Sequence, residues 1–348
     1  MKNLKKICVV GHFAFGKKYY DGQTVKAKEL TKELDKRFGT DNVLKIDTHG
    51  GAKKLPLLII KCLFGFKKSE NVIMLPAHNG VKVLSPVFAL YKKIFHRKIF
   101  YGVVGGWLPE LIKDKPFLKK CLRSFDGILV ETTSMKNNME NLGFSNIHIM
   151  LNFKDITPVA KNELNHSLKK PYRLCTFSRV MEEKGIADAV DVVCKLNNKY
   201  GETVYSLDIY GPIDDNQTEW FDNLKKDFPP YINYCGVVPF DKSVDVLKDY
   251  FALLFPTKFF TEGIPGTIVD ALVSGIPVIS SRWQNCADIV EDGYNGISYE
   301  FSRNELIFDI LENIKGNPEK FVALKENCID SSEKFISHNA INVLLELI

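Results

Sequence analysis

Residues 255–296 read FPTKFFTEGIPGTIVDALVSGIPVISSRWQNCADIVEDGYNG, and the order of their segments decides the fold. An apolar run ends at Pro256, a polar turn with Glu262 follows, and a helix-like segment from Ile268 leads to a second strand, PVIS. A strand, a turn, a helix and a strand in this order are typical of an α/β domain with a parallel sheet. Glycines in the turn let backbone N–H groups face a ligand, and the N-terminus of the following helix attracts anions.

Two carboxylates flank this turn. Glu262 and Asp270 stand eight residues apart, and Asp270 falls one helical turn or less inside the predicted helix. We therefore expect both side chains to border one pocket, with the backbone amides between them. Carboxylates that accept hydrogen bonds from sugar hydroxyls, next to amides that bind phosphate, suit a sugar nucleotide. An ordinary strand–turn–helix also favours Gly, Pro and a capping acid, and explains the same residues without a ligand.

The stretch resembles the donor-site signature of glycosyltransferase family 4, the retaining GT-B enzymes. In that signature a glutamate is followed, after seven residues, by a second glutamate, with Gly-x-Pro after the first and G-x-P-V-I after the second. The residues that match are Glu262, Gly263, Pro265, Gly275, Pro277 and Val278. Asp270 stands in place of the second glutamate, so its shorter side chain would alter the hydrogen bonds to the ribose that the resemblance implies.

A second block, FSRVMEEKG from Phe177, follows a predicted strand and resembles the family's F-x-G-R-x-x-x-x-K-G, with Ser178 in place of the usual glycine. The resemblance implies that Arg179 and Lys184 hold the donor diphosphate. Fixed cations suit this role, because the leaving nucleoside diphosphate gains negative charge as the glycosidic bond breaks. The resemblance makes Glu262, Arg179 and Lys184 the catalytic candidates. The donor-binding candidates are Gly22, Gln23, Arg179, Lys184, Gly211, Gly263, Ile264, Pro265, Gly266, Thr267 and Asp270.

Short apolar runs alternate with helix-like stretches along both halves of the chain, which predicts two doubly wound parallel sheets. We expect strands at Ile7–Val10, Val43–Ile46, Asn71–Leu75, Lys98–Val104, Gly127–Val130, Ile147–Met150, Tyr172–Phe177, Val204–Tyr210, Ile232–Cys235, Phe251–Phe255, Val278–Ser280 and Gly296–Tyr299. A polar stretch, Lys154 to Pro171, is the predicted linker. The predicted domains are 1–155 and 171–330, and a C-terminal helix in 331–348 is expected to pack back on the first domain.

The loop GHFAFGKK after the first strand approaches the phosphate-binding P-loop pattern. Lys18 stands where a Ser or Thr must reach magnesium, which argues against an ATPase. The next turn, Asp21-Gly22-Gln23-Thr24, corresponds in the family resemblance to the glycine-rich loop that approaches the donor, with Asp21 replacing one glycine.

Two further loops are candidates for the acceptor side. His78 and Gly105-Gly106-Trp107 follow predicted strands, at the edge where open α/β sheets bind ligands. Many family members carry a histidine near the reacting sugar, and either His78 or the Gly106–Trp107 loop could occupy that place. A lone histidine is more often structural.

Length and cysteine content favour a protein of two ordinary domains. The 348 residues suffice for two cores, and the eight cysteines form no CxxC pair and no Cys/His cluster. We therefore expect reduced thiols in the cytoplasm and no metal ion or other cofactor. The basic, then apolar N-terminus breaks at Gly11-His12, which predicts a first strand and no signal peptide. No apolar run is long enough to span a membrane.

Charge is distributed unevenly between the halves. Residues 1–150 contain 27 Lys and Arg against 12 Asp and Glu, and the remainder contains 20 against 30, so the net charges are +15 and −10. A basic half points to an anionic surface, and without aromatic RNA-binding patterns or zinc-finger spacings we favour a membrane over nucleic acid. A solvated lysine-rich surface is the alternative.

The segment 52–68, AKKLPLLIIKCLFGFKK, concentrates this pattern. Its apolar centre is flanked by Lys53, Lys54, Lys67 and Lys68. A core helix explains it as well as a membrane-surface helix, because Pro56 and Gly65 weaken the periodicity.

Together these features predict a GT-B fold, with two Rossmann-like domains facing each other across a cleft. The resemblance implies a retaining glycosyltransferase that moves a sugar from a UDP- or GDP-sugar to a glycan or lipid-linked acceptor, in bacterial surface polysaccharide synthesis. We expect it in the cytoplasm, peripherally on the inner face of the membrane. A nucleotide-sugar epimerase of the same fold and a non-catalytic sugar-nucleotide or glycan-binding protein are the alternatives.

Overall fold

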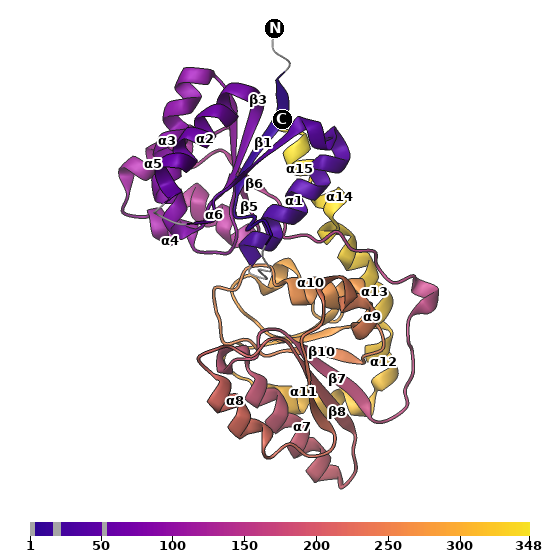
Figure 1. Cartoon of the computed structure of the whole chain (residues 1–348). Helices are drawn as coiled ribbons and strands as arrows, with labels where there is room; N and C mark the ends of the chain where they lie inside the picture. Colours follow the sequence, from indigo (N-terminus) through magenta and orange to yellow (C-terminus); the bar gives the residue numbers. More distant parts are fainter. Residues whose placement is uncertain (1–3, 17–21, 51–53) are drawn as a thin grey trace. The chain divides into compact units, whose positions relative to one another are not determined.

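The computed structural model describes residues 4–16, 22–50 and 54–348, and the chain divides into two compact units. Unit 1 consists of Met1–Asp155 with Phe335–Ile348, and unit 2 of Ile156–Lys334. Each unit is a central sheet covered by helices (Figure 1). Several residues that the sequence singles out, Lys17, Lys18, Asp21 and Lys53, lie outside the described ranges.

Unit 1 is built on a parallel sheet with the strand order β2-β1-β3-β4-β5-β6 over its described residues. The strands are β1 Lys5–Gly11, β2 Val43–Asp47, β3 Ser69–Leu75, β4 Lys98–Gly102, β5 Gly127–Val130 and β6 Ile147–Ile149. In register, Val10 of β1 lies between Ile46 of β2 and Met74 of β3. The strands are apolar on both faces because helices cover both sides.

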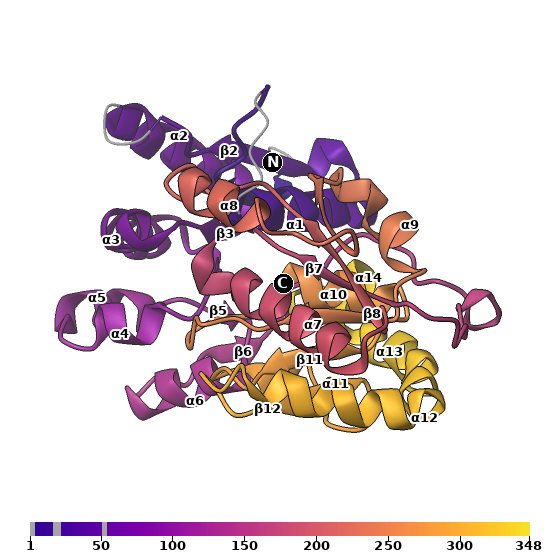
Figure 2. The same ribbon diagram turned by 90° about the horizontal axis from the view of Figure 1, so that it is seen from below.

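The two faces of this sheet have separate cores. α1 (Gly22–Phe38) packs on one face, where Leu30 is fully buried. The other face is covered by α2 Leu55–Lys68, α3 His78–Phe95, α4 Leu108–Ile112, α5 Pro116–Arg123 and α6 Thr133–Asn141 (Figure 2). Phe66 of α2 and Phe88 of α3 meet edge to face there, with ring centroids 5.0 Å apart.

The C-terminal segment belongs to unit 1 and forms two short helices, α14 Ser337–Ala340 and α15 Asn342–Leu345. Ile341 and Leu344 are buried in the same cluster as α1. The N–H of Lys154 donates to the carbonyl of Phe335 (3.1 Å), so the segment is also tied to the end of the first part of the chain.

Unit 2 carries a second parallel sheet, ordered β12-β11-β10-β7-β8-β9 in its described residues. The strands are β7 Tyr172–Phe177, β8 Tyr205–Tyr210, β9 Ile232–Gly236, β10 Ala252–Phe255, β11 Val278–Ser281 and β12 Gly296–Tyr299. One face packs on α7 Ile186–Tyr200, α8 Thr218–Lys225 and α11 Leu306–Gly316. The remaining α-helices are α9 Ser243–Leu247, α10 Gly266–Val273, α12 Pro318–Val322 and α13 Leu324–Ser332.

Short 3-10 turns connect several of these elements. They are η1 Thr40–Asn42, η3 Lys161–Glu163, η4 Glu182–Lys184, η5 Phe240–Lys242, η6 Cys286–Asp288 and η7 Glu333–Phe335. None of the helices that the structure describes combines the length and apolar character needed to cross a membrane.

The doubly wound sheets predicted from the sequence are confirmed, and each predicted strand is present within two residues at either end. Each strand order reverses once, between β1 and β3 in unit 1 and between β7 and β10 in unit 2. Ligands of open α/β sheets bind at the carboxyl ends of the strands beside such a reversal. The topology therefore directs attention to the loops after β1 and β3, and after β7 and β10.

At the reversal in unit 2 the backbone of one loop touches another. Gly185, between η4 and α7, has φ +71°, and a Cβ placed there would lie 2.1 Å from the carbonyl oxygen of Pro256 at the end of β10. Gly201, at the other end of α7, has a similar φ of +62°, but a Cβ there would meet nothing within 4 Å. Position 185 thus requires glycine both because the carbonyl of Pro256 lies so close and because φ is positive. Position 201 requires glycine only because φ is positive.

We predict that Gly185→Ala destabilises the protein more than Gly201→Ala. The left-handed backbone should cost either variant about 1–2 kcal/mol, which lowers the melting temperature by roughly 2–8 °C. Gly185→Ala should exceed this, because Pro256 must also move. Thermal unfolding of both variants measures the difference, and equal melting temperatures would show that the close approach does not matter.

Candidate active site

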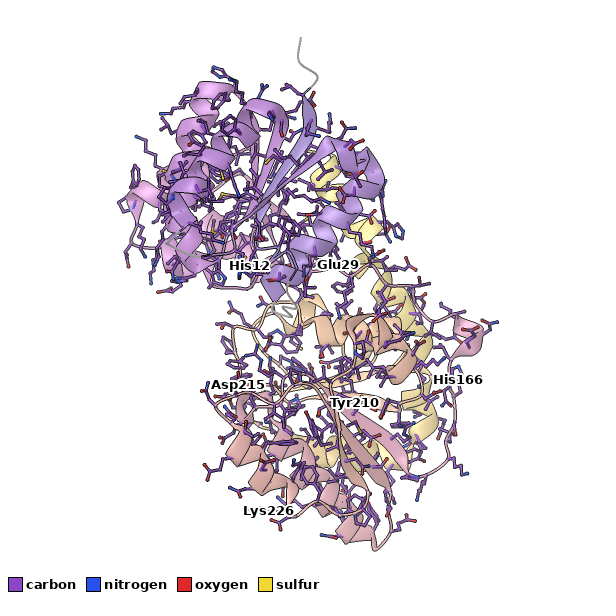
Figure 3. All side chains as sticks on the ribbon, viewed as in Figure 1. His12, Glu29, His166, Tyr210, Asp215 and Lys226 are labelled. Atoms are coloured by element: carbon purple, nitrogen blue, oxygen red, sulfur yellow. The ribbon has the colours of Figure 1, made fainter. Side chains whose placement is uncertain are left out.

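The candidate site lies at the carboxyl ends of β7, β8 and β10 in unit 2, where the sequence places the basic and acidic signature residues. The loop after β7 carries Arg179 and Lys184, and the loop after β10 carries Glu262. Tyr210, labelled in Figure 3, is the last residue of β8.

Lys184 and Glu262 form an ion pair in this site. Lys184 Nζ lies 2.6 Å from Glu262 Oε2, and the side chains are 14% and 20% exposed. The hydroxyl of Thr257 also donates to Glu262 Oε2 (3.3 Å). An ammonium group has three N–H donors, so Lys184 can keep Glu262 as a partner and still donate to an incoming oxyanion. The structure thus brings together a cation and a carboxylate that the sequence assigns to different parts of the donor.

The loop that carries Glu262 is held by the segment after β11. Asn285 Nδ2 donates to the carbonyl of Glu262 (2.5 Å), and Trp283 Nε1 donates to the carbonyl of Gly263 (3.3 Å). Both Asn285 and Trp283 are buried. Sequence reasoning missed this supporting role, although a tryptophan and an asparagine directly after a strand are a usable signal.

Arg179 lies in a second ion pair. Its Nη1 is 3.4 Å from Asp214 Oδ2, and the Arg179 side chain is 57% exposed. Asp214 follows β8, and its loop is joined to that of Arg179 through Val180, whose carbonyl accepts from the N–H of Asp214 (3.0 Å). The exposed guanidinium can therefore change partner with little rearrangement of the backbone.

Gly211 fixes how these two loops approach each other. Its φ is +131°, and a Cβ there would lie 1.9 Å from the carbonyl oxygen of Ser178. Gly211 is among the donor-binding candidates, and the structure gives it a positioning role directly beside Arg179.

Asp270 is buried, with 3% exposure, and is the fifth residue of α10. Its Oδ1 accepts from the hydroxyl of Ser243, the first residue of α9, at 3.0 Å. The residues of the preceding turn divide by exposure: Ile264 and Pro265 are buried, and Gly263, Gly266 and Thr267 are partly exposed. Because the first N–H groups of a helix have no partner within it, the start of α10 offers donors at the site.

In unit 1 the acceptor-side candidates come together. His78 is the first residue of α3, and its ring lies 5.2 Å from that of Trp107. Trp107 Nε1 donates to the carbonyl of Val104 (2.7 Å). Both alternatives that the sequence left open, His78 and the Gly106–Trp107 loop, therefore occupy one place at the carboxyl edge of the sheet.

The other unit 1 candidates lie near the same edge. Gly22 is exposed at the start of α1, and Gln23 Nε2 donates to the carbonyl of Leu75, the last residue of β3 (2.8 Å). Their position is compatible with the predicted loop, whose Asp21 lies outside the described residues.

A buried ion pair, Lys26 with Glu131, contacts the loop that carries Gly105 and Trp107. Lys26 Nζ lies 3.6 Å from Glu131 Oε1, and Glu131 Oε2 accepts from the N–H of Gly105 (3.1 Å). Burial raises the pKa of the Glu131 carboxyl and lowers that of the Lys26 ammonium, and the charge of each partner opposes the shift. Glu131 therefore positions the backbone beside Trp107.

A histidine pair at the edge of unit 1 was not predicted. His12 Nδ1 lies 2.6 Å from Thr24 Oγ1, and His12 Nε2 lies 3.0 Å from His49 Nδ1. His12 follows β1 and is labelled in Figure 3, and His49 follows β2. The available signal was their position near the ends of strands, because no short motif links His12 with His49.

The loop after β1 wraps around a carboxylate of the protein itself. Asp47 accepts from the N–H groups of Phe13, Ala14 and Phe15 at 3.0–3.3 Å, and from that of His49 at 2.9 Å. Burial alone would raise the pKa of Asp47, but these backbone hydrogen bonds lower it below its usual value. The amides that a P-loop would offer to phosphate are thus engaged, which gives a physical reason against the ATPase interpretation.

No group of three or more His, Cys, Asp or Glu side chains among the described residues is arranged to hold a metal ion. The sequence pair Asp214-Asp215 is the nearest to a metal-binding DxD pattern, and Asp214 is engaged with Arg179.

Part of the chain matches a known protein family, and the whole chain resembles solved structures. Residues 171–314, which include the whole candidate site in unit 2, match the family described as "Glycosyl transferases group 1". Anabaena HepE, solved in complex with UDP and glucose, has a TM-score of 0.73 at 13% identity, with 98% of both chains covered. This chain has the GT-B fold. The apo lipopolysaccharide outer core galactosyltransferase WaaB is also similar, with a TM-score of 0.68, 18% identity and 98% of both chains covered.

Two curated relatives extend the comparison. The alpha-monoglucosyldiacylglycerol synthase of Acholeplasma laidlawii is 31% identical over 160 residues, which are 45% of this chain and 38% of the synthase. An uncharacterized glycosyltransferase of Methanocaldococcus jannaschii is 25% identical over 276 residues, which are 77% of this chain and 72% of that protein. The chain thus spans less than half the length of the synthase. Together the matches show similarity to glycosyltransferases in sequence and the GT-B fold in structure.

Proposed function

We propose that the protein is a retaining glycosyltransferase of family 4 that transfers a hexosyl group from a UDP- or GDP-sugar. The Lys184–Glu262 pair at the sheet reversal of unit 2 carries this proposal, because it places a cation and a carboxylate at the edge where α/β sheets bind nucleotides. The proposed acceptor is a glycan or lipid-linked glycan of a bacterial surface polysaccharide.

In the proposed reaction, Lys184 and Arg179 bind the two phosphates of the donor. Arg179 would exchange Asp214 for a phosphate, which its planar guanidinium can bind through two N–H groups. As the sugar–phosphate bond breaks, the charge on the leaving diphosphate grows, and both cations stabilise that charge. No metal ion is needed for this role, and we propose a metal-independent enzyme.

Glu262 is proposed to act on the transferred sugar. The carboxylate is oriented by Lys184 and Thr257 and can accept from hydroxyl groups of a ring that becomes oxocarbenium-like. The buried Asp270, in the second turn of α10, is proposed to accept from the ribose while Ser243 orients it. His78 and Trp107 are proposed to contact the acceptor.

The names of the similar proteins agree with this chemistry. HepE was solved with UDP and with UDP-glucose, which favours a UDP-sugar donor. The similar synthase forms a glucosyl diacylglycerol by its name, which favours an acceptor at a membrane. We accordingly propose a peripheral contact of the basic unit 1 with the inner face of an anionic membrane, and no nucleic-acid partner.

The first prediction of the proposed function is that the protein turns over a nucleotide sugar. Incubation with a panel of UDP- and GDP-sugars, followed by mass spectrometry, should show release of the nucleoside diphosphate, and transfer when an acceptor extract is present. An epimerised donor without release would identify the alternative epimerase. Binding without turnover of any donor would identify a binding protein.

The second prediction concerns the diphosphate. Arg179→Ala and Lys184→Ala should each weaken UDP binding by about 10- to 100-fold, because a hydrogen bond to a charged group contributes about 1.5–3 kcal/mol. Arg173→Ala is the matched control: Arg173 is similarly exposed and paired with Asp208, but it lies at the opposite end of β7. Calorimetry measures the affinities, and unchanged affinity in both site variants would remove the assignment.

The third prediction separates rate from binding. Glu262→Gln should lower kcat far more than donor affinity, because its contacts strengthen in the transition state. Asp270→Asn should instead weaken donor binding and change kcat little. If kcat of Glu262→Gln stays within about threefold of the wild type, under ~0.7 kcal/mol of barrier, Glu262 has a structural role only.

A further inference from the structure

Unit 1 exposes a group of large apolar side chains on adjacent helices. Leu57, Ile60 and Phe64 of α2, Leu90 and Ile94 of α3, and Phe117 of α5 are each 51–66% exposed. The α2 residues follow a spacing of three and four, so they lie in one stripe along the helix. Single exposed leucines are common on proteins, but a contiguous set points to an interaction site.

These helices lie side by side, and α3 contacts both α2 and α5 (Figure 2). The hydroxyl of Tyr91 on α3 donates to the carbonyl of Ile59 on α2 (3.3 Å), and Lys92 of α3 donates to the carbonyl of Ser124, just after α5 (2.8 Å). We call the exposed side of α2, α3 and α5 the α2–α3–α5 face.

The exposed apolar side chains of these helices are not the ones that pack in the core of unit 1. The same helices bury a different set of apolar residues in the core of unit 1, which includes Cys62, Phe66, Leu84, Phe88, Leu118 and Leu122. The amphipathic helices have therefore already covered the sheet, and the apolar side chains of the α2–α3–α5 face are in excess of that need.

Charge on this part of the chain is predominantly positive. Residues 48–109 contain ten Lys and Arg and a single acidic residue, Glu70, which is paired with Lys6 (3.1 Å). The exposed lysines of α2 and α3 are Lys61, Lys67, Lys68, Lys82 and Lys93. At the end of α3, a pocket of about 480 Å³ is lined by Lys92, Lys93, His96, Arg97 and Lys98, with Asp126.

We propose that the α2–α3–α5 face docks on an anionic lipid bilayer, with its apolar side chains in the interfacial region and its lysines at the headgroups. Helices with Lys and Arg beside Leu, Ile and Phe are typical of membrane surfaces. Protein–protein interfaces are instead depleted in lysine, so the composition favours lipid over a protein partner or a second copy. The inference deepens the membrane contact of the proposed function by naming its surface, and it does not depend on transferase activity.

The proposal requires two separable contributions to binding. Attraction between lysines and headgroups is screened as salt rises from about 0.1 M to about 1 M, where the Debye length falls from about 10 Å to about 3 Å. Insertion of apolar side chains is not screened in this way. A surface whose lysines are only solvated would show at most the salt-sensitive contribution and no salt-resistant binding.

The test is cosedimentation of the full chain with vesicles of phosphatidylcholine alone and with added phosphatidylglycerol. The wild type should bind the mixed vesicles, and keep part of that binding at high salt. The triple variant Lys61→Glu, Lys67→Glu, Lys68→Glu should weaken low-salt binding by at least about tenfold. The quadruple variant Ile60→Gln, Phe64→Gln, Leu90→Gln, Ile94→Gln should lose the salt-resistant part.

Matched controls come from unit 2. The charge control replaces three exposed lysines, Lys226→Glu, Lys248→Glu and Lys320→Glu, and the apolar control is Val237→Gln. Both controls should leave vesicle binding unchanged. A wild type that ignores anionic vesicles at low salt, or controls that lose binding equally, would overturn the proposal. A third outcome would also overturn it: the wild type forms a dimer as its concentration rises, the quadruple variant does not, and neither binds vesicles.

Vesicle-free hydrolysis of the nucleotide sugar distinguishes this proposal from the proposed function. Every variant of the α2–α3–α5 face should hydrolyse the donor at the wild-type rate, because these residues lie outside the candidate active site. Loss of vesicle binding with normal hydrolysis would support the docking surface, whatever the acceptor proves to be.

Discussion

The ion pair of Lys184 and Glu262 is the interaction on which the candidate site depends, because it joins loops that are 78 residues apart in the sequence. The two loops follow β7 and β10, which are neighbours at the sheet reversal, with Leu174 beside Ala252 in register. A parallel sheet places the ends of adjacent strands at one edge, so the register of the strands determines that the two side chains meet. The pair is partly buried. Its removal should therefore cost more than loss of a surface pair and less than loss of a fully buried one.

Uncharged residues around Lys184 and Glu262 restrict the positions of the two loops without adding further charges to the pair. Gly185 allows the loop after β7 to touch Pro256, and Asn285 holds the carbonyl of Glu262. Trp283 packs edge to face on Phe255, with centroids 5.5 Å apart, and closes the apolar side of the loop. The charged side chains of Lys184 and Glu262 are therefore held by well-packed neighbours. Charges held in this way can stabilise a transition state without first reorganising.

The sequence predicts the strands well because the buried parallel strands are uniform apolar runs, and their ends coincide with polar turns. It also identifies Lys184 and Glu262 separately, through spacing and resemblance. It does not predict that they pair, because pairing depends on strand order and on the direction of two side chains. The hydrogen bond of Asp270 to Ser243 and the contact of His12 with His49 were missed for the same reason: neither forms a short motif. The break between α14 and α15 was also missed, since the C-terminal segment reads as one helix.

Two sheets of similar design carry different chemistry at equivalent edges, and the first loop of each explains why. In unit 1 the amides of Phe13, Ala14 and Phe15 donate to Asp47, so these N–H groups already bind an anion of the protein. In unit 2 the loop after β7 presents Arg179 and Lys184, whose carboxylate partners are partly exposed. Arg179 can exchange Asp214 for a phosphate, and Lys184 can bind a phosphate while it keeps Glu262. A phosphate brought to the first loop would be repelled by Asp47, whereas at the second it would meet two cations. The distribution of charge over these loops, more than the shared topology, thus supports the proposal that unit 2 binds the nucleotide.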